Sequence, residues 1–328
     1  MSASLIGRLG SSTFRLSTNS SVDVAHGLAL LFGLGTKALP SWDSKTRWNN
    51  LMGDLAVTIT AGSSRHTNSP HPSREGHHSI VGWIDLLRLR PAVIVTLGGP
   101  TVALAAKSAT TTVPIVFSVA GDPVRLGLVT TINRPGGNIT GWATLTDVVV
   151  AKQFEALHET IPVVTAFGCL LNPNNPNTET DAQAAQDAGR ALGLKVRILL
   201  VRNEAEIEKA FATLAQTGAG GLVVVSDGFF NSRPEQFAAL ALQHKIPTVF
   251  SLREFARAGG LMSYGTSLSE SYRQVGVYAG RILRGESPAD LPVVQATKTE
   301  LAINSKTAKT LGIDFPLSVI GRADEVVE

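Results

Sequence analysis

The segment from Val93 to Asp122 (VIVTLGGPTVALAAKSATTTVPIVFSVAGD) constrains the fold more than any other part of the chain. It begins in a continuous apolar run, Ala92–Leu97, whose β-branched residues are typical of a strand buried on both faces. A Gly-Gly-Pro turn then opens an Ala-rich helix, and Ile115–Val119 supplies the next strand. The segment therefore predicts a βαβ unit, with a ligand-binding edge where its strands end.

From Leu86 onward, strand-like and helix-like segments alternate. The predicted strands are Ala92–Leu97, Ile115–Val119, Val163–Leu171, Val196–Leu200, Gly221–Val225 and Thr248–Ser251. The predicted amphipathic helices include Thr178–Leu192, Glu204–Gln216 and Arg233–His244. This alternation favours a doubly wound α/β fold with parallel sheets. At 328 residues the chain is long enough for two such lobes with separate cores.

Composition argues against several classes of protein. The formal net charge is only +3 and no run of Lys or Arg occurs, so the basic pI near 9.1 indicates solvated surface charge rather than nucleic-acid binding. Cys169 is the only cysteine, which excludes an intrachain disulfide, and its apolar strand predicts a buried, inert thiol. No apolar run has the length of a membrane-spanning helix.

Residues 1–85 differ from the rest in lacking helical or strand periodicity. We interpret them as irregular: either a poorly ordered arm or a coding sequence read out of frame. Ala25–Gly35 is apolar enough for the core of a secretory signal, but it begins late and has no compact basic segment before it. The segment also contains a histidine cluster, which is either a metal site or, as we expect, a solvated loop. Its members are His66, His71, His77 and His78.

Several spaced motifs in the regular part carry a resemblance to a known family. They are GGPTVALAAKSATTTVPIVF, GDPVRLGLV, NRPGGNITG, LNPNNPN, DGFFNSR, REFARAGGLMSYG, YRQVGVYAGRILRGESPADLPVVQ and INSKTAKTLGI. Together, over Leu86–Glu328, they resemble the substrate-binding proteins of ABC transporters, whose relatives include tryptophan- and tyrosine-type uptake components. The resemblance implies two Rossmann-like lobes that resemble class I periplasmic binding proteins and close over a small organic solute. It also implies an extracytoplasmic, periplasmic location and partnership with ABC permease and ATPase subunits, with no cofactor and no catalysis.

The resemblance divides the chain into three parts. Residues 86–141 together with 262–328 are predicted to form lobe 1, and residues 142–261 are predicted to form lobe 2. Crossovers between the lobes are expected around Gly136–Gly141 and Gly259–Gly265, where glycines interrupt the pattern. Residues 1–85 depart from the family where its first strand and helix belong. We interpret the departure as an upstream frameshift that leaves lobe 1 incomplete at its N-terminus.

Four residues at predicted strand ends of lobe 1 are candidate ligand contacts. Gly99 and Thr101 offer backbone N–H groups and a hydroxyl at a helix start, which suits a carboxylate, or they form an ordinary helix start. Ser118 and Asp122 bracket the next turn. Asp122 either pairs with an amino group of the ligand or caps the helix that begins near Pro123.

Five further candidates lie in the second half of the chain. Asn174 and Asn175 follow a buried strand in a proline-stiffened loop, and their amides suit a polar ligand, although Asn is also a common turn former. Asp227 and Phe229 leave the Gly221–Val225 strand and suit an ammonium-bearing or aromatic ligand, with one of the two adjacent phenylalanines expected in the core. Tyr264 either reaches the cleft with its hydroxyl or packs at the hinge.

No catalytic set is recognisable. His158 and His244 are isolated in helical segments without a partner acid or nucleophile, and no G-x-S-x-G, Walker or full G-x-G-x-x-G motif occurs. The leading hypothesis is thus the solute-binding component of an ABC-type importer, which traps an amino-acid-like or aromatic solute. The alternatives are an α/β enzyme or a cytoplasmic ligand-sensing domain that uses the same cleft.

Overall fold

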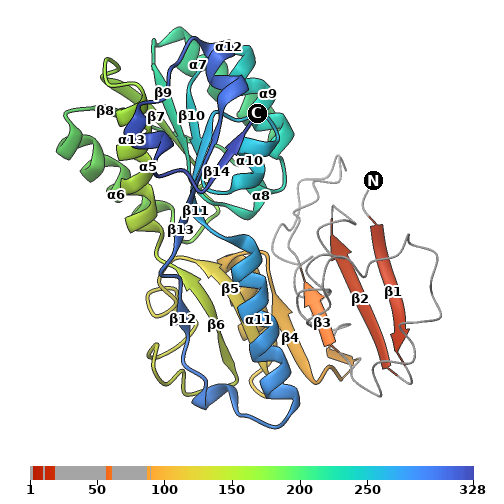
Figure 1. Ribbon diagram of the computed structural model, residues 1–328. Helices are drawn as coiled ribbons and strands as arrows, with labels where there is room; N and C mark the ends of the chain where they lie inside the picture. Colours follow the sequence, from red (N-terminus) through yellow and green to blue (C-terminus); the bar gives the residue numbers. More distant parts are fainter. Residues whose placement is uncertain (1–2, 10–11, 19–56, 61–86, 89) are drawn as a thin grey trace, which may run out of the picture. The chain divides into compact units, whose positions relative to one another are not determined.

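The computed structural model describes residues 3–9, 12–18, 57–60, 87–88 and 90–328, of which the three segments before residue 61 are described by backbone alone (Figure 1). The chain divides into two compact units. Unit 1 comprises the described residues up to Ala143 together with Ser269–Gln295, and unit 2 comprises Thr144–Leu268 together with Ala296–Glu328.

Unit 1 is built on one sheet. Its strand order is β1 (Ala3–Leu9), β2 (Ser12–Thr18), β3 (Val57–Thr60), β4 (Val93–Thr96), β5 (Ile115–Ala120), β6 (Ile139–Thr144) and β12 (Val294–Gln295). The pair β1–β2 is antiparallel, whereas β2, β3, β4 and β5 pair in parallel, as do β6 and β12. Parallel pairing with a helical crossover is what the βαβ pattern predicts.

Two helices contribute to the core of unit 1. Helix α4 (Pro100–Ala109) places Ala103 and Ala106 in a cluster with Ile94 and Phe117 of the central strands. Helix α11 (Leu268–Leu283) runs across the sheet (Figure 1), with its buried residues spaced three and four apart along one face. These are Ser271, Val275, Gly276, Tyr278, Ala279 and Ile282. Apolar residues at this spacing anchor the helix to the sheet.

Unit 2 is a second sheet. Its strand order is β14 (Glu325–Val327), β13 (Thr299–Asn304), β11 (Met262–Thr266), β10 (Thr248–Phe250), β9 (Gly221–Val224), β7 (Ala166–Leu171) and β8 (Lys195–Leu200). Among these described strands, β11–β13 is the only antiparallel pair. The carboxyl ends of β7, β9, β10 and β11 therefore share one edge of the sheet, which we call the unit 2 edge.

Successive strand residues in unit 2 point to opposite faces, and each face carries its own helices. Cys169 and Val223 pack with α5 (Thr146–Thr160) and α6 (Thr178–Leu192). Leu170 and Leu222 pack with α7 (Glu204–Gln216) and α9 (Pro234–Gln243). Shorter helices are α8 (Gly228–Asn231), α10 (Arg253–Arg257), α12 (Ser305–Leu311) and α13 (Leu317–Ile320), with a 3₁₀ turn at Pro288–Asp290 in unit 1. Burial on both faces explains the continuous apolar runs of the strands.

The predicted α/β fold is confirmed, and α6 and α7 begin and end at the predicted residues. The thiol of Cys169 is fully buried, as predicted, and burial raises its pKa. Eight of the described strands were not predicted, namely β1, β2, β3, β6, β11, β12, β13 and β14. The sheet of unit 1 also continues beyond β4 into β3, within the segment interpreted as irregular. Strand β4 therefore has a partner strand upstream, and the prediction that lobe 1 lacks this strand is corrected.

The structure also corrects the predicted division of the chain. The first unit boundary lies between Ala143 and Thr144, within β6 and two residues after the predicted boundary at residue 141. The return to unit 1 lies between Leu268 and Ser269 and not within Gly259–Gly265, because β11 pairs with β10 in unit 2. Most of the C-terminal segment predicted for lobe 1 belongs to unit 2, where residues 299–303 of β13 pair with β11.

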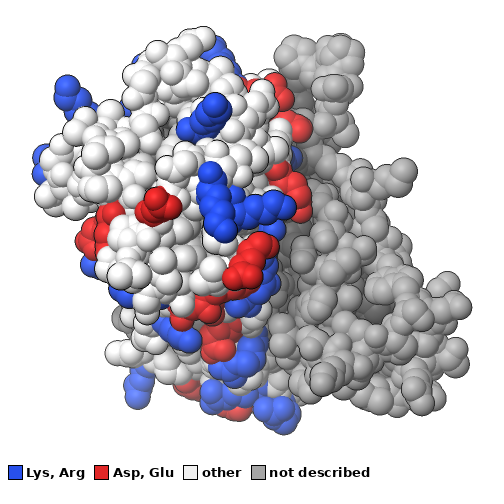
Figure 2. Space-filling model, turned by 45° about the horizontal axis from the view of Figure 1, so that its top comes forward, with Lys and Arg blue, Asp and Glu red and all other residues white. Residues whose placement is uncertain are grey.

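Charged side chains of both signs are intermixed on the described surface that Figure 2 shows, with no broad region of one sign. This distribution is what a net charge of +3 spread over both units produces. In the part of the chain that the structure describes, no helix is long and apolar enough to cross a membrane.

Candidate functional site

A hydrogen-bonded cluster occupies the unit 2 edge. The carboxylate of Asp227, which follows β9, accepts hydrogen bonds from the amide Nδ2 atoms of Asn172 and Asn175, which follow β7. The distances are 3.0 and 2.9 Å, one to each carboxylate oxygen. Asp227 Oδ1 also caps α8 by accepting from the backbone N–H of Phe229 at 2.9 Å. The edge therefore presents a carboxylate held in place from three directions.

The sequence of the asparagine loop explains its shape. The Oδ1 atoms of Asn172 and Asn175 each accept from the backbone N–H two residues later, at 3.0 Å, which is the geometry of an Asx turn. Both side chains are buried, whereas Asn174 is exposed. Of the two predicted amide contacts, Asn175 thus supports the carboxylate and Asn174 faces solvent.

A second carboxyl group lies beside this cluster. Asp181, in the first turn of α6, is only 2% exposed and accepts a 2.6 Å hydrogen bond from the hydroxyl of Thr146 at the start of α5. Burial raises the pKa of Asp181 to about 6, the Thr146 hydrogen bond opposes that shift, and the charges of Asp147 and Asp227 reinforce it. The raised pKa favours the protonated form of this carboxyl group to a higher pH than an exposed aspartate would show.

The two phenylalanines after Asp227 have different environments. Phe230 is fully buried in the core, as expected for one of the pair. Phe229 is half-buried, and the guanidinium of Arg233 lies over its ring at 4.1 Å from the ring centroid. Arg233 also donates to the backbone oxygen of Phe229 at 2.7 Å. The ring therefore already contacts a cation from its own chain, and one face is engaged.

The carboxyl edge of unit 1 (the unit 1 edge) is simpler. Gly99 precedes α4 with φ +84°, and nothing lies within 4 Å of the position that a Cβ would take. Thr101 is exposed. The hydroxyl of Ser118, on β5, lies 2.6 Å from that of Ser271 on α11. Asp122 Oδ1 accepts from the backbone N–H of Val124 at 2.8 Å and so caps a turn, and no helix begins near Pro123 among the described residues.

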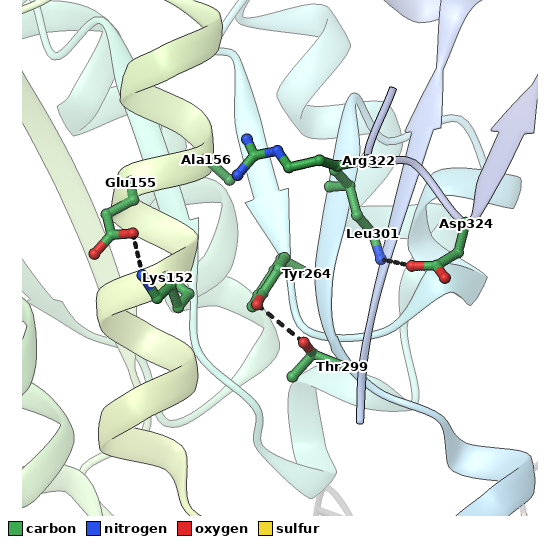
Figure 3. Close-up of a pocket in the computed structure, with 8 residues that line it drawn as sticks. All are labelled: Lys152, Glu155, Ala156, Tyr264, Thr299, Leu301, Arg322 and Asp324. Carbon is green, nitrogen blue, oxygen red and sulfur yellow. Dashed lines mark hydrogen bonds and ion pairs between the residues drawn. The ribbon is translucent and has the colours of Figure 1, made fainter. Parts of the chain in front are cut away.

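Tyr264 lies apart from these clusters. Its hydroxyl accepts a 2.9 Å hydrogen bond from Thr299 on the neighbouring strand, and its backbone oxygen accepts from Gln153 of α5. The side chain lines a pocket contained in unit 2 (Figure 3). Nothing in the described contacts places it with Asp227, so its predicted ligand role stays a prediction.

The structure brings together Asn175, Asp227 and Phe229 in unit 2, and it gathers Gly99, Thr101, Ser118 and Asp122 around the strand ends of unit 1. Sequence analysis missed the supporting residues Thr146, Asp181 and Ser271. Asp181 resembles an ordinary first-turn acid, and only its depth distinguishes it. No group of three or more metal-ligating side chains occurs among the described residues, and the histidine cluster at 66–78 lies outside them.

Comparison with known proteins decides the family. The family model for ABC transporter substrate binding proteins matches residues 73–327. This chain belongs to that family. The matched range covers both described sheets except β1, β2 and β3, so family membership rests on both units.

Individual relatives of this substrate binding protein agree with the fold. A curated tyrosine-binding protein of Clostridioides difficile is 27% identical over 209 residues, 64% of this chain, and the match spans 60% of the length of that relative. A conserved domain protein from Vibrio cholerae is 26% identical with a TM-score of 0.74, covering 92% of this chain and 94% of that one. An ABC domain from Streptococcus pneumonia in complex with L-Trp shares the fold at 24% identity, with a TM-score of 0.70, covering 76% of this chain and 85% of that one.

Proposed function

We propose that this chain is the solute-binding component of an ABC-type importer and that its solute is a small amino acid, preferably an aromatic one. The observation that carries the proposal is the Asp227 cluster at the unit 2 edge, in a chain that belongs to the substrate binding protein family. The named specificity of one relative for tyrosine and the L-Trp complex of another support the aromatic amino-acid class.

The chemistry of the unit 2 edge suits an ammonium group. An ionised carboxylate has about four lone-pair sites, and Asp227 uses three of them on Asn172, Asn175 and the Phe229 N–H. One site remains for a ligand N–H, and the two amides hold the carboxylate without neutralising its charge. Phe229 adds a half-buried aromatic surface beside it, which suits an aromatic side chain.

The unit 1 edge suits a carboxylate. Backbone N–H groups at the start of a helix attract anions, and the approach to α4 is open because Gly99 has no side chain. The hydroxyls of Thr101 and Ser118 are further donors. We assign the ammonium group of an amino acid to Asp227, with Asn174 as a further polar contact, and we propose Gly99, Thr101 and Ser118 as contacts for a carboxylate. Tyr264 is not needed for this assignment.

Isothermal titration calorimetry and thermal shift with a panel of amino acids test this proposal. Saturating tyrosine or tryptophan at a hundred times Kd is expected to stabilise the protein by about 2.7 kcal/mol. Asp227→Asn removes the charge and is expected to weaken binding at least tenfold, as loss of a charge-assisted bond does. The matched control Asp187→Asn alters an exposed acid of α6 and leaves affinity unchanged. Equal affinity in both variants would contradict the assignment.

The proposal also specifies binding without turnover. Tyrosine and tryptophan recovered after long incubation with the protein are expected to be chemically unchanged, as chromatography and mass spectrometry can show. An accumulating product would favour the alternative of an α/β enzyme.

Family membership supports a further proposal on location and partners. We propose that the chain acts outside the cytoplasm and delivers its solute to ABC permease and ATPase subunits. Fractionation of the native host followed by immunoblotting tests the location. Reconstituted permease and ATPase subunits are expected to hydrolyse ATP faster when the solute-loaded chain is added, and a lack of stimulation would count against the partnership.

A further inference from the structure

Unit 2 contains a polar pocket that has no part in the proposed solute site. Its volume is about 210 Å³ (Figure 3). The lining residues come from α5, β11, β13 and the turn before β14, and they are Lys152, Glu155, Ala156, Tyr264, Thr299, Leu301, Arg322 and Asp324. None of Asn175, Asp227 and Phe229 is among them. The pocket therefore belongs to the sheet face that α5 covers and not to the cluster at the unit 2 edge.

The charges that line this pocket are balanced. Lys152 and Arg322 supply two cations, and Glu155 and Asp324 supply two acids. Lys152 Nζ is 2.6 Å from Glu155 Oε2, and Arg322 forms an ion pair with Glu159 outside the pocket lining. Both cations are about half exposed, so these ion pairs are worth at most about 1 kcal/mol each. A charged ligand can therefore replace one partner of each ion pair at a small cost in free energy.

The other lining residues supply two hydroxyls, a carboxylate and the apolar residues Ala156 and Leu301. The hydroxyls of Tyr264 and Thr299 are hydrogen-bonded to each other at 2.9 Å, and Asp324 Oδ2 accepts from the backbone N–H of Leu301 at 2.9 Å. In Figure 3, the Arg322 side chain extends across the pocket from the side opposite this hydroxyl pair. The arrangement places a guanidinium above, hydroxyls below and an anchored carboxylate at one end.

We propose that this pocket binds a small zwitterion, a free α-amino acid with a short side chain. Its carboxylate pairs with Arg322 and Lys152, and its ammonium group pairs with Asp324. A bare anion or a bare cation satisfies only one sign of the balanced lining, whereas a zwitterion satisfies both. The volume lies below the ~300–1,000 Å³ of pockets for drug-sized ligands, which sets the small size. The proposal does not rest on the proposed solute site.

Titration of the ¹⁵N-labelled full-length chain, followed by TROSY NMR, tests this site directly. Glycine and alanine at millimolar concentrations are expected to shift the amide resonances of Thr299, Leu301 and Asp324 in a saturable way. Acetate carries only the carboxylate and ethylammonium only the ammonium, so each is expected to bind at least tenfold more weakly. Binding of acetate as tight as that of glycine would overturn the zwitterion assignment, and the absence of saturable shifts with glycine would overturn the site.

Variants locate the binding and separate it from the solute site. The double variant Lys152→Met with Arg322→Gln is expected to weaken glycine binding at least tenfold, with an unchanged Tm showing that it folds. Arg190→Gln is the matched control, because Arg190 is an exposed, ion-paired cation of α6 outside the pocket. Asp227→Asn is expected to leave the glycine shifts at Thr299 and Leu301 intact. Glycine binding that survives in the double variant, or that is lost in Asp227→Asn, would contradict the proposal.

Discussion

The carboxyl edges of the two sheets differ in how far their polar groups are already satisfied. At the unit 2 edge, Asp227 is bound by two asparagine amides and one backbone N–H, and the asparagines are themselves fixed by Asx turns. At the unit 1 edge, one hydroxyl pair joins Ser118 to Ser271, Asp122 caps its own turn, and the start of α4 is open.

We propose that this difference separates the roles of the two edges. A preassembled carboxylate loses little freedom when a ligand arrives, so the unit 2 edge is suited to give affinity and orientation. Backbone N–H groups and hydroxyls at the unit 1 edge can donate to any carboxylate, so they discriminate little between ligands that carry one. Changes in the unit 2 edge should therefore affect stability and binding together, whereas changes in the unit 1 edge should affect binding more than stability.

The largest effect on stability is expected at two glycines, one in a strand of each sheet, that pack directly against the backbone of a neighbouring segment. A Cβ on Gly265 would lie 2.0 Å from the backbone oxygen of Ser251, and one on Gly141 would lie 2.2 Å from that of Phe117. Because backbone cannot yield as a side chain does, Gly265→Ala and Gly141→Ala are each expected to cost about 3 kcal/mol, the upper end for overpacking. Hydrogen exchange measured by mass spectrometry shows whether each loss stays in its own unit.

The control for both glycines is Gly137→Ala, since Gly137 is exposed and nothing lies within 4 Å of the place that its Cβ would occupy. Its stability should stay within about 0.5 kcal/mol of the parent. If Gly265→Ala destabilised unit 1 as much as unit 2, the treatment of the two sheets as separate cores would be wrong.

The next effect falls on the unit 2 edge alone. Asp227→Ala leaves the amides of Asn172 and Asn175 without their acceptor, and both side chains are buried. Unpaired buried donors cost about 1–3 kcal/mol, so we expect a loss of about 2 kcal/mol by chemical denaturation. Asp187→Ala, which removes an exposed acid of α6, should cost less than about 1 kcal/mol. Equal losses would show that the cluster contributes no more to stability than a surface ion pair.

The pKa of Asp181 predicts a pH dependence for the stability of unit 2. Its folded pKa of about 6 lies above the ordinary 3.8, so its contribution favours folding at low pH and is lost as pH rises through 6. The difference corresponds to at most about 3 kcal/mol, and we expect about 1–2 kcal/mol. Asp181→Asn keeps an acceptor for Thr146 and abolishes this loss, so its stability relative to the parent should grow from pH 4 to pH 7.

Thr146→Val removes the hydrogen bond that opposes the shift, and it should move the midpoint of the parent's pH dependence upward. A flat difference between Asp181→Asn and the parent over this pH range would mean that the carboxyl group is more hydrated than its 2% exposure indicates.

Local pattern determined how well each element could be predicted. Strands β4, β7 and β9 are buried on both faces and read as apolar runs, and α6 and α7 show helical periodicity with clear ends. Strand β6 (ITGWAT) has no such pattern, because it buries a polar residue and contains a glycine. The buried Thr140 donates its hydroxyl hydrogen bond to the backbone oxygen of Leu291, and Gly141 leaves room for the backbone of Phe117 on the neighbouring strand. The missed strands, and with them the unit boundaries, depend on pairing between distant segments.

The candidate site shows the same limit. Asn175, Asp227 and Phe229 could be proposed because they follow predicted strands, and strand ends gather at one edge. Sequence spacing could not reveal three contacts of the site. These are the bonds from two asparagines to Asp227, the bond from Thr146 to Asp181, and the position of the Arg233 guanidinium over the ring of Phe229. These contacts join residues up to 55 positions apart, and their geometry is set by the packing of helices on the sheet.

The smallest stability effect is expected from Ser118→Ala in unit 1. The 2.6 Å bond between the hydroxyls of Ser118 and Ser271 joins β5 to α11, and losing one neutral hydrogen bond costs about 1 kcal/mol. Ser108→Ala removes an exposed hydroxyl that bonds only its own helix, and it should cost less. A double-mutant cycle with Ser271→Ala isolates the pair, because the second substitution adds nothing once the partner hydroxyl is gone.

Affinity decides what this hydroxyl does beyond packing. If the unit 1 edge donates to the solute as proposed, Ser118→Ala weakens tyrosine binding about tenfold while stability falls by only about 1 kcal/mol, because a lost hydrogen bond to a charged group costs more than a neutral one. Ser271→Ala disrupts the same pair from the helix side and should leave affinity nearer to that of the parent. Equal affinities in the two variants would assign the pair to holding α11 on the sheet and would leave α4 and its backbone N–H groups as the contacts of unit 1.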